Sequence, residues 1–264
     1  MKDRQMTSRP IPASLAGIVA GLELRQPKVV TSRLLGEIAA EVGVELRPQL
    51  VAERLVRAGW LLPLRLRDSW EFAPAAHAGP YGWNDTWIEL RALLLQHPNA
   101  PLAVAFQSSL WELGHTSHQP TVPVLAHRPT WRGPRIVGAR SISYDWKLPA
   151  VIIRGLPVWQ EATALVAAAH RPAAQGDWPN ADDWLSPTFR SVNLENLMTE
   201  ATGRGNATMA RLGYMAQWTG RDDIADHIDG LLTVERQVTF FGPRHPKGRW
   251  INRWRLYDAL LPSR

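Results

Sequence analysis

The segment from residue 47 to residue 72 constrains the fold most, because its apolar period changes from helical to extended within one short stretch. Pro48 suits the first position of a helix, where a missing N–H group costs nothing. Gly59 suits the position after a helix end, which needs a left-handed backbone. The apolar residues between them follow helical spacing: Val51, Ala52, Leu55 and Ala58. We therefore predict a helix over residues 48–58.

From residue 60 onward the apolar period is two, as in a strand with one buried face. One parity holds Trp60, Leu62, Leu64 and Leu66, and the other holds Leu61, Pro63, Arg65 and Arg67. Asp68 and Ser69 are residues typical of turns, and Trp70 and Phe72 resume the apolar parity. The pattern predicts a hairpin with a basic outer face and tip.

The residues before this segment complete a recognisable order. Ser14 is a candidate cap for a first helix, residues 28–30 form a short candidate strand, and Thr31 or Ser32 can cap a second helix that Gly43 ends. The order helix, strand, helix, turn, helix, hairpin is that of a winged helix–turn–helix. We predict this module over residues 12–75.

Such a module places its last helix in the major groove of DNA and its hairpin along phosphates. The candidate DNA-binding residues are Arg33, Arg47, Gln49, Arg54, Arg57, Arg65, Arg67 and Ser69. The alternative interpretation is an ordinary solvated helix and hairpin that carries several arginines.

Residues 74–83 are rich in Ala, Gly and Pro and are predicted to link two domains, residues 1–75 and residues 76–264. The second domain is expected to be mixed α and β, so the predicted fold class is α+β. Its expected helices span 85–97, 108–113, 160–169, 186–202, 206–218 and 222–232. Its expected strands span 122–125, 135–142 and 150–158, followed by a closing hairpin of 235–241 and 249–256.

The chain has 264 residues and a formal net charge of +6. Residues 236–264 contain seven Lys or Arg residues against Asp258 alone, a surplus equal to that of the whole chain. In the predicted last strand, Arg249, Arg253 and Arg255 share one face, opposite Trp250 and Trp254. This face is interpreted either as a second site for a polyanion or as a charged edge that deters aggregation.

Motifs that would indicate catalysis are missing from the sequence, which has no phosphate-binding glycine loop, His-Glu-x-x-His or Gly-x-Ser-x-Gly. His115 and His118 are expected in a surface loop. We therefore expect no catalytic residues, no metal and no cofactor. The chain has no cysteine and no apolar run of the ~20 residues that span a membrane. A cytoplasmic protein without a membrane partner is the expectation.

Four stretches in order along the chain resemble the AbiEi family, the antitoxins of type IV toxin–antitoxin systems. The first is the winged helix, with Arg-Leu-Val-Arg-Ala-Gly-Trp-Leu at residues 54–61. The others are Ser-Ser-Leu-Trp-Glu-Leu-Gly at 108–114, a strand-to-helix junction at 158–166, and Arg-Leu-Gly-Tyr-Met at 211–215. The likeness is greatest to actinobacterial, mycobacterium-like members.

The resemblance implies a repressor that binds inverted repeats of double-stranded operator DNA before its own operon. It also implies a functional partner, a nucleotidyltransferase-like toxin that is countered without a stable complex. Residues 76–264 would then act in antitoxicity and cooperative repression. Two alternatives remain: a stand-alone regulator whose second domain senses a ligand, and an enzyme with an appended DNA-binding domain. A neighbouring toxin gene favours the antitoxin, and a ligand-dependent change in DNA affinity favours the regulator.

Overall fold

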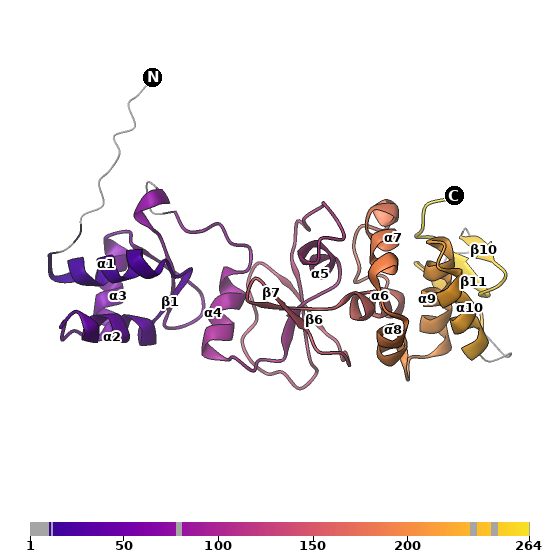
Figure 1. Ribbon diagram of the computed structural model, residues 1–264, viewed down its shortest axis with the longest axis horizontal. Helices are drawn as coiled ribbons and strands as arrows, with labels where there is room; N and C mark the ends of the chain where they lie inside the picture. Colours follow the sequence, from indigo (N-terminus) through magenta and orange to yellow (C-terminus); the bar gives the residue numbers. More distant parts are fainter. Residues whose placement is uncertain (1–10, 12, 78–80, 233–236, 244–247, 264) are drawn as a thin grey trace, which may run out of the picture. The chain divides into compact units, whose positions relative to one another are not determined.

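The structure is a computed structural model that describes residues 11, 13–77, 81–232, 237–243 and 248–263. Its internal contacts divide the chain into two compact units, Met1–Ala100 with Gly133–Val137, and Pro101–Arg132 with Gly138–Arg264. Figure 1 shows the helices and strands along the chain. Both units combine helices with small sheets, so the fold is mixed α+β, as the sequence predicts.

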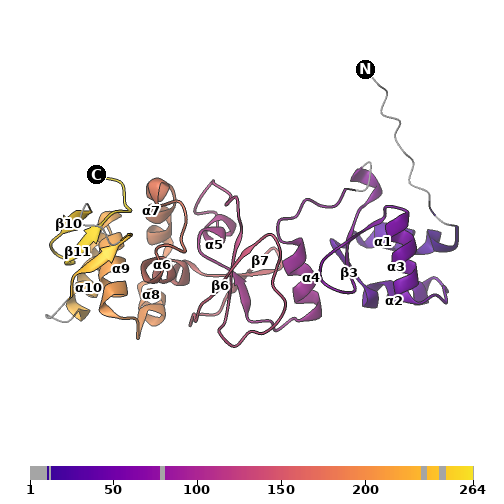
Figure 2. The same cartoon turned by 180° about the vertical axis from the view of Figure 1, so that it is seen from behind.

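The first unit follows the predicted order of elements. Its helices are α1 (Ala16–Arg25), α2 (Ser32–Glu41), α3 (Pro48–Arg57) and α4 (Ile88–Gln96), and its strands are β1 (Val29–Thr31), β2 (Leu61–Pro63) and β3 (Ser69–Phe72). Short 3-10 turns precede α1 and follow β3, at Ala13–Leu15 and Ala75–His77. Figure 2 shows α1, α2, α3 and β3 together in this unit.

Local chemistry explains where these helices begin and end. The Thr31 hydroxyl accepts a hydrogen bond from the Leu34 amide and caps α2, as predicted. Pro48 is the first residue of α3, and Gly59 after it has a φ of 78°, which confirms the left-handed position. The predicted cap at Ser14 is wrong, because α1 begins at Ala16 without a side-chain cap.

The three strands form an antiparallel sheet in the order β1-β3-β2. Leu61 pairs with Phe72 and Pro63 with Trp70, so these four side chains share one face. The predicted parity, with Leu62 beside Phe72, is therefore wrong. Trp60 is buried but precedes the strand, and Leu61 takes the core position with no exposed surface. The hairpin itself is confirmed.

The predicted boundary at residue 75 lies inside the first unit. Helix α4 packs on β1 and β3, and buried Leu90 and Leu93 lie on it. The Asp85 carboxylate joins the preceding loop to this unit by ion pairs of 2.8 Å with Lys28, the residue before β1, and 2.8 Å with Arg91 of α4. Composition alone placed the boundary at the Ala-, Gly- and Pro-rich loop and missed these tertiary contacts.

A five-stranded mixed sheet lies in the second unit, in the order β6-β5-β4-β8-β7. Its strands are β4 (Leu102–Val104), β5 (Val124–His127), β6 (Arg140–Ser143), β7 (Val151–Ile153) and β8 (Leu156–Val158). The central strand β4 was not predicted, because three buried residues after Pro101 carry no alternating pattern. The strand expected at 150–158 is a hairpin, which turns at Arg154 and Gly155 with φ angles of 50° and 74°.

The helices of the second unit form its largest apolar core. They are α5 (Gln107–Glu112), α6 (Glu161–His170), α7 (Ala181–Ser191), α8 (Leu194–Ala201), α9 (Asn206–Trp218) and α10 (Asp222–Leu231), with a 3-10 turn at Trp178–Asn180. Helix α6 is buried along nearly its whole length, as its alanines predict. The single helix expected at 186–202 is instead two, because Asn193 caps α8 through a 3.2 Å bond from the Asn196 amide.

A third sheet closes the chain, with β9 (Thr239–Phe241), β10 (Arg249–Ile251) and β11 (Leu256–Asp258) in the order β10-β11-β9. Strand β9 pairs with β11 in parallel, so the predicted hairpin of 235–241 with 249–256 is wrong. A turn at residues 252–255 interrupts the expected last strand. Arg236, Arg244, Lys247 and Arg264 lie outside the described residues.

Candidate nucleic-acid interface

The outward face of α3 carries polar and charged side chains at helical spacing. Its buried stripe is Val51, Ala52 and Leu55. The opposite stripe, at i, i+3, i+4 and i+7, is Leu50, Glu53, Arg54 and Arg57, with exposed Gln49 beside it. Because the helix begins at Pro48 and no acidic residue lies in its first turn, its positive end is left uncompensated by a local carboxylate. This face suits an anionic partner.

The predicted arginines differ in how far their charge is already paired. Arg33 of α2 lies 2.9 Å from Glu37, Arg57 lies 3.7 Å from Glu53, and Arg67 lies 3.5 Å from Asp68. All three arginine side chains are highly exposed, and exposed pairs of this kind are weak and easily exchanged for phosphate. The remaining arginines of the predicted set are Arg47, Arg54 and Arg65. No described carboxylate lies within ion-pair distance of them.

The hairpin presents its basic residues in the loop of residues 64–68, which we call the wing loop. Arg65 and Arg67 are both exposed there, and the Arg67 side chain is 94% exposed. The backbone closes the loop through a bond of 3.2 Å from the Leu64 amide to the Ser69 carbonyl. The structure therefore places both arginines at the tip, as predicted, with their guanidinium groups in solvent.

Ser69 is the exception among the predicted contacts. It is only 2% exposed, and its hydroxyl accepts a 2.9 Å hydrogen bond from the Gln96 side chain of α4. A buried hydroxyl that is already bonded cannot reach a phosphate, so its prediction as a DNA-binding residue is wrong. The turn chemistry that singled it out is local, whereas its partner lies 27 residues away in sequence.

Sequence reasoning also missed three residues at this surface. Leu50 is 37% exposed on the outward stripe of α3, where an apolar side chain can contact a thymine methyl group. Its spacing from Glu53 and Arg57 was a signal that could have found it. Glu89 and Gln96 of α4 form hydrogen bonds with the wing loop. No local sequence pattern predicts such a contact.

The second predicted basic site is not assembled. Arg249 donates to Tyr214 and to Asp258, at 2.5 and 3.1 Å. Arg253 lies 2.6 Å from Asp226 and 3.1 Å from Asp229 of α10, and the hydrogen bond to Asp226 raises the pKa of its guanidinium. Arg255 is the last residue of the turn at 252–255 and has a φ of 47°. The prediction that the three share a strand face is therefore wrong, and carboxylates compensate two of them.

The predicted histidine loop lies beside two helices. His115 Nε2 lies 2.9 Å from Glu161 Oε1 and 3.4 Å from Ser191 Oγ. The hydrogen bond between His115 and Glu161 lowers the pKa of Glu161. In a catalytic triad the two ring nitrogens of the histidine contact the nucleophile and the carboxylate separately. Here Nε2 makes both contacts, so His115, Glu161 and Ser191 do not have the geometry of a triad. Among the described residues, no group of three or more His, Asp or Glu side chains is placed to hold a metal ion.

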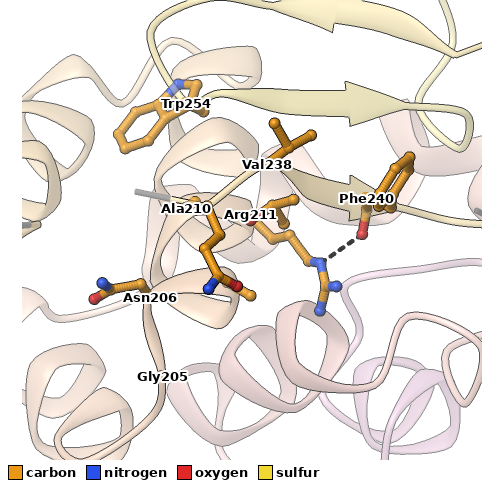
Figure 3. Close-up of a pocket in the computed structure, with 10 residues that line it drawn as sticks. Gly205, Asn206, Ala210, Arg211, Val238, Phe240 and Trp254 are labelled. Atoms are coloured by element: carbon orange, nitrogen blue, oxygen red, sulfur yellow. Dashed lines mark hydrogen bonds between the residues drawn. The ribbon is translucent and has the colours of Figure 1, made fainter. Parts of the chain in front are cut away.

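A pocket of about 500 Å³ opens in the second unit beside the start of α9. Figure 3 shows Asn206, Ala210, Arg211, Val238, Phe240 and Trp254 around it. The Arg211 Nε group donates a 2.9 Å bond to the Phe240 carbonyl oxygen, and its Nη1 group donates to Ala169. Burial lowers the pKa of Arg211. The pocket combines a cation with aromatic walls.

Comparison with known proteins identifies a structural relative. The crystal structure of the RV2827C protein from Mycobacterium tuberculosis matches with a TM-score of 0.83 and 25% sequence identity, over 96% of this chain and 94% of that chain. The α+β fold is thus shared over nearly the whole length of both proteins. No protein-family model and no curated protein sequence matches this chain. No helix in the described part of the chain is long and apolar enough to cross a membrane.

Proposed function

We propose that this protein is a cytoplasmic, DNA-binding repressor whose first unit acts as a winged helix on duplex operator DNA. The observation that carries the proposal is the combined geometry of α3 and the wing loop. One exposed helix face and one exposed hairpin tip belong to the same small unit, and Arg47, Arg54 and Arg65 there have no described carboxylate partner. Helix side chains would read base edges, and the wing loop would contact phosphates.

We further propose that the repressor is the antitoxin of a type IV toxin–antitoxin pair. The support is the ordered resemblance to the AbiEi family in four stretches. Three of them form defined elements of the second unit, namely α5, the junction between β8 and α6, and the middle of α9. The partner would be a nucleotidyltransferase-like toxin that is countered without a stable complex. The antitoxin assignment depends on this resemblance, whereas DNA binding depends on the interface.

One experiment tests both parts. The region before the gene is fused to a reporter, and the adjacent gene is expressed with and without this protein. We expect repression of the reporter and rescue of growth from the adjacent gene product. Repression without rescue would remove the antitoxin role and leave a DNA-binding regulator. The absence of repression and of binding to the upstream region would overturn the proposal as a whole.

The pocket beside Arg211 favours a second candidate, a regulator whose second unit senses a small anionic ligand. A ligand that binds there should raise the melting temperature of the full chain and change its affinity for upstream DNA. The variant Arg211→Met should abolish both effects. No change in DNA affinity with any ligand that raises the melting temperature would exclude the sensing role.

A further inference from the structure

The wing loop is held from outside the winged helix by two side chains of α4. The Gln96 side-chain amide donates to the carbonyl oxygen of Arg67 at 2.6 Å and to the Ser69 hydroxyl at 2.9 Å. Glu89 Oε1 accepts a 3.0 Å bond from the backbone amide of Arg65. Glu89 and Gln96 are seven residues apart, about two helical turns, and so lie on the same face of α4.

These bonds fix the backbone of both wing arginines, and neither guanidinium group takes part in them. Each contact ends on a main-chain group or on the buried hydroxyl of Ser69. The Arg67 side chain remains 94% exposed. A loop of this length with Asp68 at a φ of 55° would otherwise have several backbone arrangements to choose from. The contacts from α4 select one backbone arrangement, and they do not involve the guanidinium groups of Arg65 and Arg67.

Helix α4 is itself anchored to the sheet that carries the wing. Asp85, just before the helix, pairs with Lys28, which immediately precedes β1, and with Arg91 of α4, both at 2.8 Å. Burial works against ionisation of Asp85, but hydrogen bonds from Lys28, the Trp87 amide and Arg91 outweigh it and lower its pKa. The side chains of Asp85, Glu89 and Gln96 therefore connect the start of β1, helix α4 and the wing loop.

We infer that Glu89 and Gln96 are positioning residues for DNA binding, which set the wing loop in its binding conformation before DNA arrives. The inference rests on the proposed function, because it concerns how the same surface meets phosphates. A loop ordered in advance loses less conformational freedom on binding, and affinity rises accordingly. The DNA-binding unit then extends through α4 to Ala100 and does not end at residue 75.

Glu89 allows positioning to be separated from charge. Its carboxylate lies beside the wing loop, so removing its charge alone should favour phosphate binding slightly. Glu89→Gln removes the charge and keeps an oxygen that can accept the Arg65 amide. Glu89→Ala removes both. If positioning dominates, the Ala variant binds DNA more weakly than the Gln variant, and if charge dominates, the two variants bind alike.

The test uses the full chain and a synthetic duplex of random sequence, because the wing loop is expected to contact phosphates. Gln96→Leu and Glu89→Ala should each weaken binding about three- to tenfold, in line with the cost of ordering a few side chains and a loop. Glu89→Gln should bind at least as well as the wild type. In an Arg65→Ala, Arg67→Ala background, Gln96→Leu should have no further effect, because it acts through those arginines.

Amide hydrogen exchange gives a second readout that does not depend on DNA. Glu89→Ala and Gln96→Leu should accelerate exchange in residues 64–69 while the rest of the first unit keeps its protection. Unchanged exchange there, or an equal loss of affinity for Gln96→Leu in both backgrounds, would overturn the positioning role. If the wild type fails to bind the duplex at low salt, the proposed function falls and this inference falls with it. Wild-type binding with unaffected variants would overturn the inference alone.

Discussion

The two arginine-rich segments of this chain look alike in sequence and differ in the fold. Around α3 and the wing loop, Arg47, Arg54 and Arg65 have no described carboxylate partner. Near the end of the chain, Arg249 and Arg253 are bonded to Asp258, Asp226 and Asp229. The partners of the second group include α10, more than twenty residues away in sequence. A local surplus of charge therefore does not predict charge that is available to a ligand.

Asp258 shows that the arginines near the end of the chain have a structural role. Asp258 is 4% exposed and accepts hydrogen bonds from Tyr214, Arg249 and the amides of Leu260 and Leu261. Burial and the adjacent carboxylate raise the pKa of Tyr214, so its hydroxyl stays protonated and donates. Arg249 and Arg253 are thus part of the fold, whereas Arg47, Arg54 and Arg65 of the first unit have no described carboxylate partner.

The largest effect is expected at Asp258. Asp258→Ala removes four hydrogen bonds and leaves Arg249 without a carboxylate, so we expect a loss of about 3 kcal/mol in the free energy of unfolding. Denaturant unfolding of the purified chain measures it. Asp145→Ala is the matched control, because Asp145 forms an exposed 2.9 Å pair with Arg128, and it should cost less than about 0.5 kcal/mol. Similar losses in the two variants would contradict a structural role for the C-terminal charges.

A pH-dependent effect is expected at Asp85, whose pKa is lowered in the folded state. A lowered carboxyl pKa contributes stability above the unfolded value of about 3.9, and this contribution is lost as the pH falls through the folded value. Asp85→Asn should therefore destabilise the protein by about 1–2 kcal/mol at neutral pH. The difference from wild type should shrink below about pH 4. A difference that stays constant from neutral to acidic pH would show that the carboxylate charge is not responsible.

The face of α3 should control sequence discrimination. Gln49→Ala or Arg54→Ala should reduce the preference for upstream DNA over random DNA by about 1–3 kcal/mol, if either side chain reaches a base edge. Competition binding with the two duplexes measures the preference. Arg190→Ala, at an exposed arginine of α7 in the second unit, is the control and should leave it unchanged. An equal fall in affinity for both duplexes would reassign Gln49 and Arg54 to phosphate contacts.

Much of the first unit was predictable because its signals are local. Pro48, Gly59 and Thr31 act on their own neighbours, and each occupies the predicted helix boundary. The helix 206–218 was likewise predicted with its observed bounds. The strand parity at Leu61 failed because Trp60 packs into the core from the turn before the strand, where alternation does not yet apply.

What could not be predicted depends on partners distant in sequence. The burial of Ser69 by Gln96, the pairing of Arg253 with α10, and the parallel partnership of β9 with β11 are all set by tertiary packing. The interrupted last strand belongs to the same class, since Trp254 turns inward against Gly213. A Cβ atom on Gly213 would lie 2.2 Å from the Trp254 ring, so only glycine allows this approach.

The salt dependence of DNA binding shows which of the two arginine-rich segments contacts phosphate. Affinity of the full chain for a random duplex is measured at several salt concentrations for three proteins: wild type, Arg65→Ala with Arg67→Ala, and the triple alanine variant of Arg249, Arg253 and Arg255. Each lost phosphate contact lowers the slope of log affinity against log salt by about one. We predict a slope about two units flatter for the wing variant and a wild-type slope for the triple variant. A flatter slope for the triple variant and a wild-type slope for the wing variant would show that the C-terminal arginines, and not the wing loop, contact phosphate.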